Sequence, residues 1–263
     1  MTLEKEVKDK SAKTRYFQRL SLRTKKALVI HKYQGRLWDK EDSWKNVSEH
    51  CLVEAARSEV FADLLGLPED IKSDLRLAAT GHDFNKRNDM EKANLGMNEL
   101  SKSGSQAETD MRNVGFSERV IIWIRGLEDN RLLAVEGIAS KPAPSSDEIA
   151  YMVMHYLDDY TINSNWTTSV ELVSDGRRIN DLDRRIDKLE ANPKYTDLNE
   201  EGRTIFNGET AFQAQRRVGH LIETKLAELI NKKQGTTIDP LNLPEFVDER
   251  LKQRILNMQW KDL

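Results

Sequence analysis

The chain has 263 residues, of which 32% are charged and 38% are hydrophobic, and its formal net charge is −3 at pH 7. This length allows a packed core without disulfides, and the slightly acidic balance argues against a protein that coats extended nucleic acid. The single cysteine, Cys51, excludes an internal disulfide, and no run is apolar for long enough to serve as a signal core or a membrane span. We therefore expect a cytoplasmic protein with no membrane partner.

Helices are the predicted elements throughout, because the apolar residues recur at steps of three and four and strictly alternating runs are short and rare. Asn46 and Ser48 are suited to cap a first helix that ends near Gly66, and Pro68 opens a second that runs to Gly81. The later helices are predicted at 117–125, 146–162, 180–189, 209–232 and 244–258. The predicted loops are 101–106, 140–145, 192–208 and 233–240.

The predicted fold class is all-α. Composition changes little at the predicted loops, so the sequence gives no reason for a separate second domain. We expect one helical domain over residues 1–165, N-terminal helix included, and a helical extension over residues 166–263 that packs on it. The sequence leaves the oligomeric state open, a homo-oligomer included.

Two histidines continue the apolar stripes of the first two predicted helices. His50 lies three residues before one stripe and His82 four residues after the other, with Asp83 directly behind it. The stripes are Val53, Ala56, Val60 and Leu64, and Ile71, Leu75 and Ala78. Buried imidazoles and carboxylates cost free energy unless they are hydrogen-bonded or bind a metal. A single histidine would be read as a hydrogen-bonded core residue, but two with an aspartate favour a metal site.

The mixture of nitrogen and oxygen ligands suits a first-row divalent ion better than calcium, which prefers oxygen alone. The predicted cofactor is therefore one divalent metal ion, and Mn, Fe, Co, Ni and Zn all fit this ligand set. The sequence does not indicate which of these five metals is bound.

The segments SEHCLVEAA and LGLPEDIKSDLRLAATGHDFNK resemble the HD-domain superfamily of metal-dependent phosphohydrolases. The resemblance covers about residues 47–87, with a looser match near 151–160, which is well under half of the chain. It implies an HD-domain-like helical bundle with the C-terminal extension added. It also implies a metal bound by His50, His82, Asp83 and a later aspartate.

The segment YMVMHYLDDYT offers two acids for the last ligand, Asp158 and Asp159, and helical phase does not separate them. Members of the family tend to place apolar residues directly before the ligand and two residues after it. Leu157 and Tyr160 fit this pattern around Asp158, which is the predicted ligand. Asp159 would then lie on the helix surface or beside the ligands.

The resemblance also suggests roles for residues near the predicted ligands. Asp83 would bind the metal and orient water, and Lys86, in an HDxxK pattern, would contact a phosphate oxygen; the alternative for Lys86 is an exposed lysine at a helix end. Glu54, one turn after His50, is read as a surface acid in preference to a residue supporting the ligands. His155 is read as packed between helices in preference to a substrate contact.

A divalent ion with open positions can lower the pKa of bound water and polarise a phosphoryl oxygen. The predicted function is therefore hydrolysis of a small phosphorylated substrate, either a nucleotide or another metabolite. One alternative is an HD-type iron oxygenase, which the absence of histidines between His82 and His155 disfavours. The other alternative is a non-catalytic regulatory protein that binds a nucleotide or metal.

Three arginine pairs in the C-terminal third fit no motif. Acids intersperse the first two pairs, which favours salt-bridged helix faces over a clamp for polyphosphate. The pairs are Arg177 and Arg178, Arg184 and Arg185, and Arg216 and Arg217.

Overall fold

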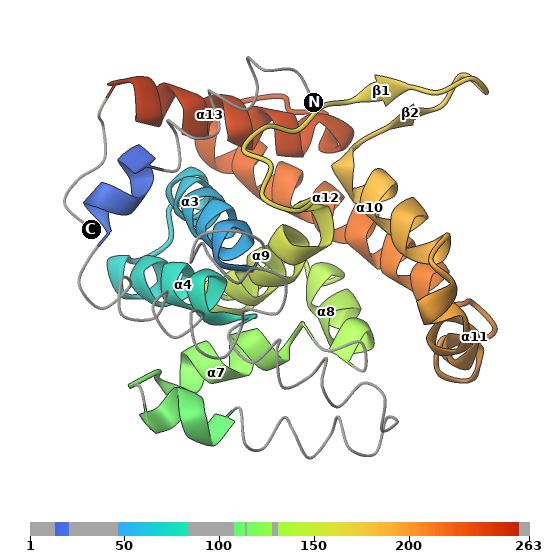
Figure 1. Ribbon diagram of the computed structural model, residues 1–263. Coiled ribbons are helices and arrows are strands. Elements are labelled where there is room, and N and C mark those ends of the chain that lie inside the picture. Colours follow the sequence, from blue (N-terminus) through green and yellow to red (C-terminus); the bar gives the residue numbers. More distant parts are fainter. Residues whose placement is uncertain (1–13, 21–46, 84–107, 114, 128–130, 258–263) are drawn as a thin grey trace.

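A computed structural model describes residues 14–20, 47–83, 108–113, 115–127 and 131–257. These residues form a bundle of helices, and their strands are limited to one small antiparallel hairpin (Figure 1). The prediction of an all-α fold is confirmed. None of the described helices is both long enough and apolar enough to cross a membrane.

Helix α3 (Val47–Leu65) lies inside the bundle, and all of its residues except Glu49 and Asp63 are buried. Gly66 ends it at φ +64°, and the Leu67 amide donates to the Ala62 carbonyl to close the last turn. Helix α4 (Glu69–Gly81) follows directly and packs along α3. The helix–turn–helix predicted from Gly66 and the following proline is thereby confirmed, and it places the ends of the two helices close together.

Helix α9 (Ser146–Tyr160) connects the two parts of the bundle, because it packs on α3 and α4 and also on helices of the C-terminal part. A capping box between Ser145 and Glu148 fixes its first turn. The shorter helices α7 (Glu118–Arg125) and α8 (Leu132–Ala139) pack against it near its beginning. Its last turn lies beside α3.

The C-terminal part begins with the hairpin, in which Glu171 faces Ile179 and Leu172 faces Arg178. One hydrophobic core runs through the described residues on both sides of position 165. The proposed division there stays a prediction. The elements of this part are β1 (Glu171–Leu172), β2 (Arg178–Ile179), α10 (Asp181–Glu190), η3 (Pro193–Tyr195), α11 (Thr196–Ile205), α12 (Ala211–Gln234), η4 (Pro240–Asn242) and α13 (Leu243–Asn257).

The predicted loop 192–208 is wrong, because most of it forms η3 and α11. Gly202 is the one residue of α11 that is classed as buried, so no buried apolar side chains mark this helix in the sequence. It packs through close backbone approach: a Cβ at Gly202 would come 2.2 Å from the Ala211 nitrogen. The helix α8 and the hairpin were also absent from the sequence prediction. The predicted loop 101–106 lies outside the described residues.

Candidate metal centre

Four side chains from three helices meet at one point inside the bundle. His50 and Glu54 come from α3, His82 follows the end of α4, and Asp158 comes from the last turn of α9. One ligand atom of each lies within 4.8 Å of the others. Two of these residues are 108 positions apart in the chain, so the packing of α9 against α3 brings them together.

The separations match those of atoms that share one metal ion. The Nε2 atom of His50 lies 2.8 Å from Glu54 Oε1 and 3.3 Å from Asp158 Oδ1, and His82 Nε2 lies 3.8 Å from the same Asp158 oxygen. Ligand atoms bound to one ion at roughly 2.0–2.2 Å each lie at most about 4.4 Å apart. The three separations given lie within this limit, and no pair of ligand atoms in the group is more than 4.8 Å apart.

Buried polar atoms without hydrogen bonds give an independent sign of a cation site. Both carboxylate oxygens of Glu54 and the Nε2 atom of His82 are buried and have no hydrogen-bond partner among the described residues. Glu54 Oε1 lies 2.8 Å from His50 Nε2, and Glu54 Oε2 lies 3.4 Å from His82 Nδ1, so this carboxylate faces both imidazoles. Leaving such groups unsatisfied costs about 1–3 kcal/mol each, and more for a charge. A divalent cation would satisfy all three atoms.

Both imidazoles are oriented by backbone carbonyls. His50 Nδ1 lies 2.8 Å from the Asn163 carbonyl oxygen, and His82 Nδ1 lies 3.0 Å from the Ala79 carbonyl oxygen. With the proton on Nδ1, each ring donates to its carbonyl and turns the Nε2 lone pair toward the cluster. Asn163 has φ +52°, in the left-handed region that asparagine tolerates better than most residues. This backbone conformation places the Asn163 carbonyl within hydrogen-bond distance of His50.

The two carboxylates attract positive charge to the centre. Burial alone would lower the pKa of His50, but Glu54 and Asp158 overcome it and raise the pKa to about 10. Burial would raise the pKa of Asp158, but Arg185 and the two histidines hold it well below its usual range. Without a metal, the carboxylates hold a proton on His50, and a bound cation would replace that proton.

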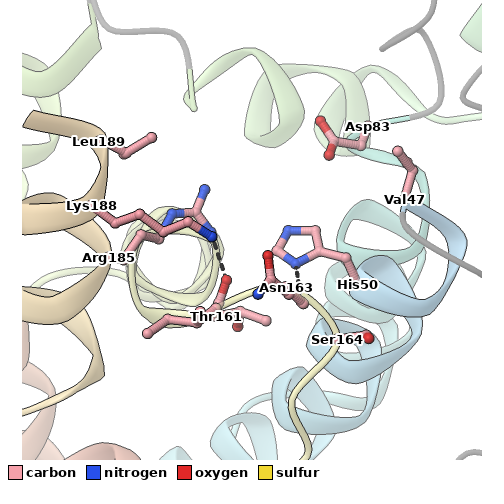
Figure 2. A pocket seen from close by; sticks show the side chains of 10 residues that line it. Val47, His50, Asp83, Thr161, Asn163, Ser164, Arg185, Lys188 and Leu189 are labelled. Carbon is pink, nitrogen blue, oxygen red and sulfur yellow. Dashed lines mark hydrogen bonds between the residues drawn. The ribbon is translucent and has the colours of Figure 1, made fainter. Parts of the chain in front are cut away.

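A pocket of about 350 Å³ opens beside the cluster, and His50 belongs to both. Figure 2 shows His50 and Asp83 on one side of this pocket and Arg185 and Lys188 of α10 on the other. The volume is within the range of small-molecule sites. The arrangement gives a small ligand access to the edge of the cluster between groups of opposite charge.

The cluster includes one residue that was not among the expected ligands, and it leaves one expected ligand outside. Glu54 was read as a surface acid, which is wrong, because it is fully buried and belongs to the cluster. Asp83 is outside the group of four; its Oδ2 lies 3.9 Å from His82 Nε2, and its side chain faces the pocket. Its role as a metal ligand stays a prediction. Lys86 lies outside the described residues.

The two neighbouring acids of α9 point to different surroundings. Asp158 lies in the cluster, whereas Asp159 is buried on another side of the helix and accepts a hydrogen bond from Gln215 at 2.6 Å. His155 is buried with its Nδ1 atom 3.9 Å from Asp159, away from the group of four. Cys51 is fully buried, as expected of a small core residue.

Most of the paired arginines form surface salt bridges, as the sequence predicts. Arg185 departs from that pattern, because its partner is Asp158 of the cluster and it lines the pocket. Lys188, one turn further along α10, was missed; its spacing of three residues from Arg185 is the signal that places both on one helix face. The other pairs are Arg177 with Asp175, Arg178 with Asp239, Arg184 with Asp181, Arg216 with Asp183 and Arg217 with Glu209.

Comparisons of the chain with protein-family models, with curated proteins and with solved structures give no match. The functional argument therefore rests on the geometry of the cluster and on the motifs around it.

Proposed function

We propose that this protein is an HD-like, metal-dependent phosphohydrolase that acts on a nucleotide or another small phosphorylated compound. The observation that carries the proposal is the convergence of His50, Glu54, His82 and Asp158, with unsatisfied buried atoms, at the edge of an open pocket. The HD-type motif around His50 and the His82–Asp83 pair supports the same assignment.

The four clustered residues would hold one divalent ion from Mn, Fe, Co, Ni and Zn. Such an ion supplies a water of lowered pKa and polarises a phosphoryl oxygen. The carbonyls of Asn163 and Ala79 keep the two imidazoles in place. The histidine side chains would therefore need little reorganisation to bind a metal ion.

Asp83 is the residue best placed to act as the general base that accepts a proton from the attacking water. Its carboxylate faces the pocket next to His82 and would accept a hydrogen bond, and then a proton, from the attacking water. The apolar side chains of Val47 and Leu189 also line the pocket and would limit the entry of other water. Lys86 keeps its expected role as a phosphate contact.

Among the described residues, one such group of ligands is found, which favours a one-ion site over the two-iron site of an oxygenase. A regulatory binding protein would use the same centre without turnover. Metal stoichiometry and turnover are therefore the two quantities that separate the three functions.

The test is elemental analysis of the purified protein, followed by assays with a phosphomonoester, a phosphodiester and a panel of nucleotides. We expect about one ion per chain, and we expect His82→Ala to lose both the metal and the hydrolysis. Lys232→Ala, at an exposed residue of α12 outside the cluster, is the control. A metal-loaded protein that hydrolyses none of these substrates would contradict the proposal and favour the binding protein.

A further inference from the structure

The wall of the pocket that faces the metal cluster belongs to the C-terminal part of the chain. Arg185 and Lys188 lie three residues apart on α10, and both line the pocket. In Figure 2 their side chains extend from α10 into the space that His50 and Asp83 border from the other side. A ligand in the pocket would therefore lie between these two cations and the cluster.

The Arg185 guanidinium is held in a fixed orientation by two hydrogen bonds and has further N–H donors that could bind a ligand. Its Nη1 atom donates to the Thr161 carbonyl at 2.7 Å, and its Nη2 atom donates to Asp158 Oδ1 at 2.9 Å. A guanidinium carries five N–H donors, so these two bonds leave three for a ligand. An arginine anchored in this way loses little conformational freedom when it binds an anion.

Lys188 differs from the charged residues around it. Its neighbour Arg184 pairs with Asp181 and Glu171, and Arg216 pairs with Asp183 on the adjacent helix. Within the described residues, Lys188 forms neither an ion pair nor a side-chain hydrogen bond, although it lines the pocket. It is thus a positive charge beside the pocket that is not used in holding helices together.

We propose that Arg185 and Lys188 form an anion subsite that binds the phosphoryl group of the substrate and presents it to the metal cluster. Arg185 would contribute paired N–H donors to phosphoryl oxygens, and Lys188 would contribute a mobile point charge. This inference rests on the proposed function, whose substrate it specifies: the phosphoryl group enters between α10 and α3. The C-terminal extension would then supply part of the binding site.

Lys188 provides the cleaner test, because Arg185 also contacts a proposed metal ligand. The experiment measures the Kd of inorganic phosphate for the metal-loaded protein by calorimetry, with metal content determined for each variant. We expect Lys188→Gln to weaken phosphate binding about tenfold with the metal retained, since a charged hydrogen bond is lost. Lys188→Arg should keep most of the affinity. Lys232→Gln, at an exposed lysine near the end of α12, is the matched control and should bind as the unaltered protein does.

The outcomes separate the subsite from the hydrolase. Phosphate affinity that is equal in Lys188→Gln and Lys232→Gln overturns the subsite, and so does loss of metal from Lys188→Gln, which would indicate a structural role. Phosphate binding that depends on Lys188, in a protein that hydrolyses no phosphorylated substrate, supports the subsite and contradicts the proposed hydrolysis. Hydrolysis of a phosphorylated substrate, in a protein whose phosphate affinity does not depend on Lys188, supports the proposed hydrolysis and contradicts the subsite.

Discussion

Asp158 and Asp159 are consecutive residues whose side chains have different partners. Asp158 Oδ1 lies near both histidines of the cluster and accepts a hydrogen bond from Arg185, whereas Asp159 bonds to Gln215 of α12. Asparagine keeps the shape of either side chain and removes its charge. The two positions therefore form a matched pair for a test of metal binding.

We predict that Asp158→Asn loses most of its metal and that Asp159→Asn keeps it. The reason is that Asp158 places a carboxylate oxygen within the group of four ligand atoms, whereas Asp159 does not. Elemental analysis after purification checks the result, and circular dichroism confirms that both variants are folded. Retention of metal by Asp158→Asn, with loss from Asp159→Asn, would show that the last ligand is wrongly assigned.

Glu54 and Asp83 form a second comparison, because the sequence favours one as a ligand and the structure brings in the other. We expect Glu54→Gln to lower metal affinity by about 100-fold, the upper end of the effects seen for residues that only support ligands. Asp83→Asn should lower metal affinity less and turnover more, since Asp83 lies outside the group of four and faces the pocket. Competition with a chromogenic chelator measures affinity. A larger loss of affinity in Asp83→Asn would restore Asp83 as the ligand.

The sequence predicts the two histidines because each continues an apolar stripe, so helical phase alone turns them inward. Helical phase does not predict that Glu54 is buried, because a charged residue in a helix is normally assigned to the solvated face. Helix α3 has almost no solvated face: elements pack around it on all sides, and a residue outside the apolar stripe is still buried. That condition depends on helices far along the chain, which local patterns do not reveal.

At the level of elements, the turn after α9 matters as much as the helices. It carries the Asn163 carbonyl that orients His50, and it is held from the other side by Arg57 of α3. Arg57 donates to Thr161 Oγ1 at 2.9 Å and to the Asn165 carbonyl at 3.0 Å. Its guanidinium also pairs with Asp248 of α13, with both side chains at most 5% exposed. The C-terminal helix is thereby connected to the metal site.

We predict that Asp248→Ala destabilises the protein by about 3–5 kcal/mol, because it leaves the buried Arg57 charge without its partner. The double variant Arg57→Met with Asp248→Leu should recover most of this loss while still binding metal more weakly, since the turn has lost its anchor. Urea unfolding measures stability, and Lys252→Ala, in an exposed pair with Glu249 on α13, should change it by less than about 1 kcal/mol. A double variant with unaltered metal affinity would limit the role of Arg57 to stability.

Helix boundaries are predictable where a local signal marks them. Ser145 and Asn180 cap α9 and α10 through their own side chains, and Gly66 ends α3 in a left-handed turn. The hairpin is different, because its four strand residues are held by pairing across the Gly176 turn and not by an apolar pattern. Elements that bury few apolar side chains leave little trace in the sequence, whatever their place in the fold.

On the scale of the whole molecule, a buried polar network joins α9, α10 and α12 beneath the site. Tyr156 donates to Glu223 at 2.6 Å, and Asn180 donates to the same carboxylate oxygen. His220 lies between Glu223 and Asp183, at 2.8 and 3.1 Å. The five residues come from three segments that are distant in the chain, so the sequence does not show that they are in contact. The network fixes α10, and with it Arg185, relative to α9.

His220 makes this network sensitive to pH. Hydrogen bonds to Asp183 and Glu223 raise the pKa of His220 from 6.5 in the unfolded chain to about 9, with Arg216 also paired to Asp183. The stabilisation is complete below pH 6.5 and disappears as pH rises through 9. Because the side chain is 36% exposed, solvent screening reduces it to about 1 kcal/mol. We predict that the unfolding free energy lost on His220→Gln is about 1 kcal/mol larger at about pH 6 than at about pH 9.5. Urea unfolding at both pH values checks this, and an equal loss at both would show that folding does not raise the pKa of His220.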